Sequence, residues 1–107
     1  MPANELGARI SALAYLDALK LKTQLQVAMD EILAPYDGLI TPAALGEAPI
    51  GLASTGDPIF CSPWTLMGHP ALCLPLLKGS NGLPLGVQMV GKYGDDGALF
   101  RAARTLL

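Results

Sequence analysis

The sequence predicts an α/β protein in which a long helix, a strand, a loop, a short helix, a β-hairpin and a final helix follow one another. Three observations carry this prediction. Apolar residues recur at helical spacing over residues 4–34, the pair Asn81-Gly82 separates two apolar runs, and the acidic pair Asp95-Asp96 precedes a second helical pattern. With 107 residues, the chain (residues 1–107) is expected to form one domain, with few strands for a sheet of its own.

The long helix is predicted over residues 4–34. Asn4 is the expected N-cap, and Pro35 ends the helix because a proline disfavours helical geometry at the preceding residue. The apolar positions of this pattern are Leu6, Ile10, Leu13, Leu16, Leu21, Leu25, Ala28 and Ile32. An unbroken helix of this length would extend about 45 Å, more than the width of a compact domain of this size. The helix is therefore expected either to break or to project toward a partner.

A short strand is predicted next, over residues 37–41 (DGLIT), closed by Pro42. Its apolar run is typical of a buried strand at the centre of a sheet. Residues 43–55 mix Gly, Ala, Pro and Ser without a sustained period, and their only charge is Glu47. This stretch is therefore expected to be a loop that crosses apolar surface.

The short helix is predicted from the types of the residues around Trp64–Met67. Ser62 is the expected N-cap, Pro63 fits the first turn, and Gly68 fits the C-terminal end. These local preferences are enough to define a helix of one or two turns.

The hairpin is predicted over the apolar runs 71–77 and 85–90. An Asn-Gly pair between two such runs is a strong signal for a tight turn between antiparallel strands. Pro75 and Pro84 cannot donate to a ladder, so they predict edge positions, bulges or strand ends.

The final helix is predicted after Asp95 and Asp96, with Arg101 and Arg104 toward its other end, as the helix dipole favours. Its apolar positions are Ala98, Leu99, Phe100, Ala103, Leu106 and Leu107.

The composition is apolar and weakly charged. The apolar fraction is 51% and the charged fraction 15%, whereas about a quarter of the residues of a soluble domain are usually charged. Part of the apolar surface is therefore expected to bind a partner, either in a homo-oligomer or in a complementary chain. A net charge of -2 with seven basic residues does not predict nucleic-acid binding. Apolar runs too short for a membrane span and the lack of a signal-peptide pattern predict a cytoplasmic protein.

The metal-binding residue types are few. Cys61 and Cys73 are the only cysteines and His69 is the only histidine, so Cys and His alone do not complete a four-ligand zinc site. No metal or cofactor is expected. Both cysteines have apolar neighbours in the sequence and are expected to be reduced residues in or near the core.

Four motifs follow one another from residue 36 onward. They read YDGLITP at residues 36–42, GDPIF at 56–60, PWTLMGHPA at 63–71 and GLPLGVQMVG at 82–91. In this order they resemble the closing segment of amidase-signature hydrolases, and the likeness extends over the chain from Asn4 to Leu107. Beyond YDGLITP, the matching positions are Gly56, Asp57, Pro58, Phe60, Pro63, Trp64, Gly68, Pro70, Ala71, Gly82, Leu83, Pro84, Gly86, Gln88 and Gly91.

The resemblance implies a fold and a reaction. The fold is a large mixed sheet with helices on both faces, of which this segment resembles the C-terminal part. The reaction is hydrolysis of a carboxamide by a serine that a lysine activates through a second serine, with backbone amides that stabilise the oxyanion. The serines of this chain are Ser11, Ser54, Ser62 and Ser80, and none lies in a paired Gly-Ser-Ser-Gly setting. No catalytic residue is therefore assigned, and this chain alone is expected to lack activity.

The resemblance also indicates a candidate substrate pocket. Asp57, Cys61, Trp64 and Thr65 lie in a region that approaches the substrate in complete amidases, so they are candidate substrate-binding residues. A purely structural role is the alternative for each of these four residues. Asp57 suits a helix start, for example, and Trp64 carries the largest apolar side chain.

Two further candidate catalytic assignments, a Lys78–Ser80 pair and His69 as an acid or base, are disfavoured against structural roles. Lys78 and Ser80 have the types of a lysine-activated serine, but the hairpin turn explains them better, because nothing in a solvated turn depresses a lysine pKa. His69 has no carboxylate near it in the sequence to orient it, and a structural role after Gly68 is favoured. The family usually has an apolar residue at this position.

Three hypotheses about function stay open at this point. The chain is the C-terminal segment of an amide hydrolase whose catalytic residues lie elsewhere. Alternatively, it is a stand-alone, non-catalytic remnant that self-associates as a structural or binding module, because an incomplete sheet leaves an open edge. Thirdly, it complements a separate subunit that carries the catalytic residues.

Overall fold

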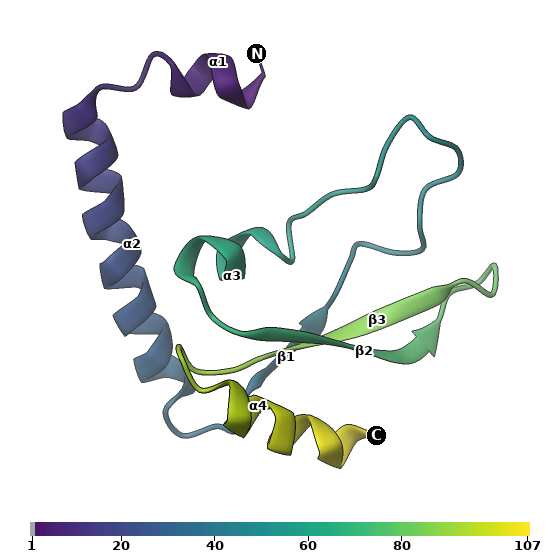
Figure 1. The fold of residues 1–107 in the computed structure, drawn as a ribbon. Helices are drawn as coiled ribbons and strands as arrows, with labels where there is room; N and C mark the ends of the chain where they lie inside the picture. The colour runs from purple at the N-terminus through teal and green to yellow at the C-terminus, as the bar shows by residue number, and fades with distance from the viewer. Residues whose placement is uncertain (1) are drawn as a thin grey trace.

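A computed structural model describes residues 2–107 and shows a mixed α/β fold (Figure 1). Its elements are α1 (Ala3–Gly7), α2 (Ala12–Leu33), β1 (Leu39–Pro42), α3 (Ser62–Met67), β2 (Ala71–Lys78), β3 (Pro84–Val90), α4 (Asp96–Ala103) and the 3-10 turn η1 (Arg104–Leu106). The strands form one antiparallel sheet in the order β1-β3-β2. The predicted order of elements is confirmed.

The N-terminal helical pattern is broken between α1 and α2, which is one of the two outcomes expected for a helix of this predicted length. Ser11 is the N-cap of α2, and its Oγ accepts a hydrogen bond from the Ala14 N–H at 3.1 Å. The predicted N-cap, Asn4, lies inside α1, where its Oδ1 accepts from the adjacent Glu5 N–H. A serine in the middle of a helical pattern competes as a cap, and the periodicity of apolar residues does not register that competition.

The predicted central position of β1 is also wrong. β1 pairs with β3 alone, from Leu39 opposite Val90 to Pro42 opposite Val87, and β3 is the central strand. The prediction rested on apolar residues on both faces of the strand. In the described chain one of these, Ile40, is 54% exposed.

The hairpin is confirmed, as are the positions of its prolines. β2 pairs with β3 from Ala71 opposite Val90 to Lys78 opposite Pro84. The register shifts between Leu74 and Leu77, so Pro75 lies in a bulge. Pro84 is the first residue of β3, where its missing N–H costs no interior ladder bond.

Two small cores lie on opposite faces of the sheet. Successive side chains of a strand point to opposite faces, so Met89 and Val90 belong to different layers. One core consists of Leu74, Met89, Leu99 and Ala103, where α4 covers the sheet. The other consists of Trp64, Met67 and Val90 with the partly buried Met29 and Leu39, where α3 and α2 pack. Figure 1 shows the N-terminal part of α2 extending away from the sheet.

The short helix is confirmed with a change at its start. Cys61 is the N-cap in place of the predicted Ser62, whose hydroxyl donates to the Pro58 carbonyl at 3.0 Å. Gly68 ends the helix in the left-handed region, at φ 75°, and its N–H donates to the Trp64 carbonyl at 2.8 Å. Few residues other than glycine adopt this conformation without strain.

The predicted burial of the two cysteines is wrong: Cys61 and Cys73 are free and exposed. Cys73 alternates along β2 with Leu72 and Leu74, which pack on the α4 side. Its side chain therefore points to the opposite face. An apolar sequence neighbourhood did not reveal this alternation.

The chain exposes more surface than a compact protein of its size. Its accessible area is 7844 Å² for 11.1 kDa, whereas a folded monomer of that mass exposes about 5,650 Å², so the excess is about 2,200 Å². The radius of gyration is 16.6 Å, compared with about 13 Å for a compact domain of this length. No helix in residues 2–107 has the length and apolar character needed to cross a membrane.

Candidate functional site

A buried glutamine in the central strand forms the junction of three segments. Gln88 is 6% exposed, and its Nε2 donates to the Thr41 hydroxyl at 3.0 Å and to the Phe60 carbonyl at 2.7 Å. These bonds join β1 and the segment before α3 to β3. Sequence reasoning treated Gln88 only as a motif position. The sequence did indicate a special role for Gln88, because it is the only polar side chain in the strand PLGVQMV.

One of the four predicted substrate-binding residues, Cys61, lies close to this junction, and Asp57 lies four residues before it in the chain. The Cys61 Sγ is 3.9 Å from the Gln88 Oε1 and 3.6 Å from the Ala43 carbonyl oxygen. Asp57 is exposed, and its Oδ1 accepts from the Ile59 N–H at 3.0 Å. Asp57 also lines a groove between the long loop and the start of β3. Both side chains are accessible, and their role in substrate binding stays a prediction.

The other two predicted residues are neighbours on α3 and differ in exposure. Trp64 is buried against Met67 and Val90 in the core, whereas Thr65 is exposed. The structure therefore does not bring Trp64 and Thr65 to a common surface. The core role proposed for Trp64 agrees with this burial, and a role for either residue at a substrate also stays a prediction.

The hairpin turn explains Lys78 and Ser80. Both are exposed, and the turn is closed by hydrogen bonds from the Gly79 N–H to the Leu83 carbonyl and from the Gly82 N–H to the Gly79 carbonyl. Within residues 2–107, no hydrogen bond links the Lys78 and Ser80 side chains, and none ties either one to another group. A lysine-activated serine needs such a contact.

The long loop between β1 and α3 also contacts the hairpin turn, through Glu47. The Glu47 carboxylate accepts from the Asn81 N–H at 2.8 Å and fills the space next to Gly79, where a Cβ would collide with it. The single charge of the loop thus anchors the loop to the hairpin. Beyond this anchor the loop exposes Ile50 and Leu52 fully.

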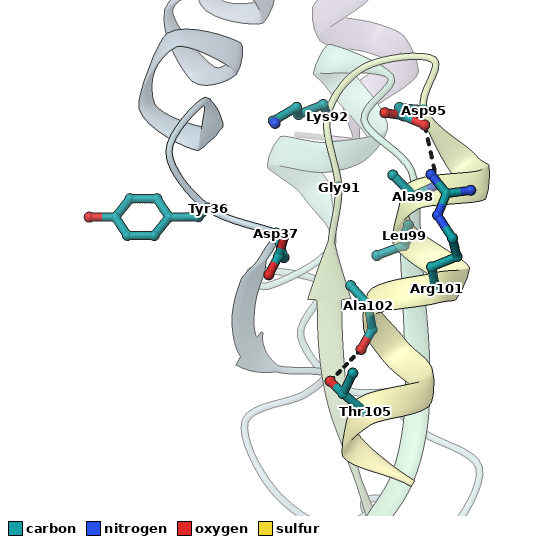
Figure 2. Close-up of a pocket in the computed structure, with 10 residues that line it drawn as sticks. All are labelled: Tyr36, Asp37, Gly91, Lys92, Asp95, Ala98, Leu99, Arg101, Ala102 and Thr105. Carbon is teal, nitrogen blue, oxygen red and sulfur yellow. Dashed lines mark hydrogen bonds between the residues drawn. The ribbon is translucent and has the colours of Figure 1, made fainter.

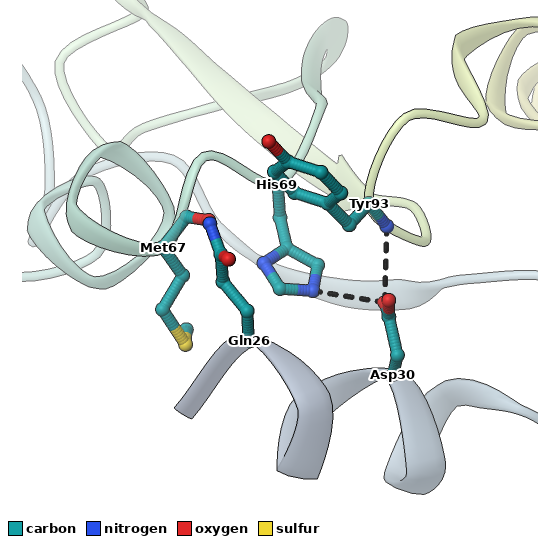
Figure 3. Close-up of polar contacts among 5 residues, drawn as sticks. All are labelled: Gln26, Asp30, Met67, His69 and Tyr93. Atoms are coloured by element: carbon teal, nitrogen blue, oxygen red, sulfur yellow. Dashed lines mark hydrogen bonds and ion pairs between the residues drawn. The ribbon is translucent and has the colours of Figure 1, made fainter. Parts of the chain in front are cut away.

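The single histidine has a carboxylate partner that sequence reasoning missed. The His69 Nε2 lies 3.0 Å from the Asp30 Oδ1, which also accepts from the Tyr93 N–H at 3.0 Å (Figure 3). Asp30 lies 39 residues earlier in the chain, on α2. A search for partners close in sequence could not find it.

A hollow between the start of β1, the end of β3 and α4 gathers charged side chains (Figure 2). These are Asp37, Lys92, Asp95 and Arg101. The Asp95 Oδ1 accepts from the Ala98 N–H at 3.2 Å, as expected for an N-cap, and the Lys92 Nζ donates to the Ala34 carbonyl at 3.3 Å. Two of the four charges therefore serve helix ends. In residues 2–107, no cluster of His, Cys, Asp or Glu suits a metal ion.

The family model described as Amidase matches residues 2–100. The chain belongs to this family. Among curated relatives, it is 35% identical over 95 residues to a glutamyl-tRNA(Gln) amidotransferase subunit of Thermotoga maritima and 39% identical over 100 residues to the subunit of the same name in Desulforamulus reducens. These matches cover 83% and 86% of this chain.

A solved structure shares the amidase fold of this segment. It is described as "Crystal structure of amidase" and matches with a TM-score of 0.69 and 30% identity. The match covers 88% of this chain and 24% of that one. The chain likewise spans about one fifth of the length of the curated relatives, 20% in both cases above. This chain thus corresponds to a segment of an amidase-signature protein, as the motifs predicted.

Proposed function

We propose that this chain is a scaffold segment of an amide hydrolase whose catalytic lysine and two serines lie outside these 107 residues. The observation that carries the proposal is the partial match: the family model covers residues 2–100, yet the chain spans only 24% of an amidase structure. Its own serines have no lysine or other base within hydrogen-bonding contact in residues 2–107. The hydrolysed bond in this proposal is a carboxamide, as the family resemblance implies.

The proposed partner is the complementary portion of an amidase-signature protein. The excess exposed area of about 2,200 Å² exceeds the roughly 800 Å² that each partner buries in a standard interface. The free edge of β1 and an adjacent apolar groove are available to it. The groove is lined by Ile40, Pro42, Leu45, Leu77, Leu85 and Val87, among others. We place this assembly in the cytoplasm, which is supported by relatives named for a tRNA amidotransferase.

Complementation tests this proposal. The Thermotoga maritima relative, with its matching segment removed, would be co-expressed with this chain. The two are expected to co-purify and to hydrolyse a simple carboxamide, whereas this chain alone shows no turnover. The Lys78→Ala and Ser80→Ala variants serve as matched controls and should support the same activity. Turnover by the isolated chain that Ser80→Ala abolishes would overturn the assignment.

Self-association is the second candidate, favoured by the same exposed area. Sedimentation of the chain alone separates the two candidates, because the remnant hypothesis requires a stable homo-oligomer and the segment hypothesis requires the complementary portion. A monodisperse monomer with a cooperative unfolding transition, and without affinity for the truncated relative, would contradict both.

A further inference from the structure

One carboxylate oxygen joins three parts of the fold. The Asp30 Oδ1 on α2 contacts the His69 Nε2, in the turn between α3 and β2, and accepts from the Tyr93 N–H, in the turn after β3 (Figure 3). Both distances are 3.0 Å. An ionised carboxylate only accepts hydrogen bonds, so the His69 Nε2 carries the proton in this contact.

The imidazole is held from several sides. The His69 side chain is fully buried, while that of Asp30 is 40% exposed. The rings of Trp64 and Tyr93 pack against it edge to face, with centroids 6.4 Å and 6.1 Å away. Gln26, one helical turn before Asp30, donates its amide to the Met67 carbonyl. The imidazole therefore inserts between two polar residues of α2 (Figure 3).

Apolar packing holds α2 only weakly. Leu33 is its one buried residue, and Met29 is partly buried against the core of Trp64, Met67 and Val90. Ile32 is 60% exposed and Leu25 is 39% exposed. Apolar contact is not directional, whereas a hydrogen bond is limited in distance and angle. The polar contacts of Asp30 and Gln26 are therefore the ones that can set the direction of the helix.

We propose that Asp30 and His69 form a latch that fixes the direction in which α2 leaves the sheet. Without the latch, α2 stays helical and keeps its contact at Leu33, but it swings about that end. The latch thereby determines where the helix presents its exposed apolar residues. It depends on contacts within this chain and not on the proposed hydrolase function.

Distance measurements between spin labels test the latch directly. Cys61→Ser and Cys73→Ser remove the native thiols, and Ala18→Cys on α2 and Ser80→Cys in the hairpin turn carry the labels; both labelled positions are exposed. Pulsed electron resonance then gives the distribution of distances between them. The parent distribution is expected to be narrow. Asp30→Ala is expected to broaden it about twofold, because the hydrogen bonds that limit the helix direction are lost.

Glu31→Ala is the matched control, since Glu31 is the adjacent acidic residue on α2 and is exposed. It should leave the distribution narrow, with the helical circular dichroism unchanged in both variants. Asp30→Asn retains an acceptor oxygen and should give an intermediate width. If Asp30→Ala does not fold, His69→Leu removes the latch while filling the same space, and the same broadening is expected. Equal widths for the latch variants and Glu31→Ala would refute the proposal.

Discussion

Replacing Gln88 by leucine should weaken the attachment of β1 and of the segment before α3 to the central strand, and so lower the stability of the fold. The change keeps the side-chain volume but removes the two hydrogen bonds from Nε2 to the Thr41 hydroxyl and the Phe60 carbonyl. Each such bond contributes about 1 kcal/mol net, and partners left unsatisfied when partly buried add to the loss. Gln88→Leu is therefore expected to lower the free energy of unfolding by about 2–3 kcal/mol.

Urea denaturation followed by circular dichroism measures this loss. With a denaturant slope of about 1–3 kcal/mol per molar, the midpoint should fall by about 0.7–3 M. Gln24→Leu, at an exposed position of α2, is the matched control and should leave the midpoint nearly unchanged. Thr41→Val completes a double-mutant cycle, with an expected coupling of about 0.5–1.5 kcal/mol. A midpoint shift no larger than that of the control would refute the role of Gln88 as a junction.

Three further changes test the helix ends and the open edge of the sheet. Ser11→Ala should lower the free energy of unfolding by about 1 kcal/mol, because the Ala14 N–H loses its cap; unchanged stability would contradict the cap. Gly68→Ala should cost about 1–2 kcal/mol, because Gly68 has a φ of 75°, and the thermal midpoint measures it against Gly46→Ala, at an exposed loop position. Ile40→Lys should leave the thermal midpoint of the isolated chain within about 1 °C, because Ile40 is 54% exposed here. It should abolish co-purification with the truncated relative, because Ile40 lines the groove proposed for the partner. Retained binding would place the interface elsewhere.

The features predicted correctly from the sequence are those fixed by neighbouring residues. The Gly68 helix end, the Asn81-Gly82 turn and the start of the final helix at Asp95 and Asp96 each depend on a backbone preference or an interaction within a few residues. The motif series likewise identified the family, because it needs only the order of residues. Such signals carry no information about which segments meet across the fold.

The features that were missed depend on long-range contacts. The pairing of His69 with Asp30 joins residues 39 apart in the chain, and no periodicity encodes such a distance. The exposure of Cys73 depends on its position in the alternation of β2, which was fixed only once the register with β3 was known.

The incorrect prediction for β1 bears on the proposed function. Leu39 and Ile40 point to opposite faces of the sheet, and a strand with apolar residues on both faces is typical of a sheet interior. Within residues 2–107, β1 has one neighbouring strand, and its other edge is free. Proteins usually cover or pair such edges, because unpaired backbone groups recruit other strands. The sequence of β1 is therefore suited to an environment that these residues do not supply, and a further strand from the complementary portion would provide it.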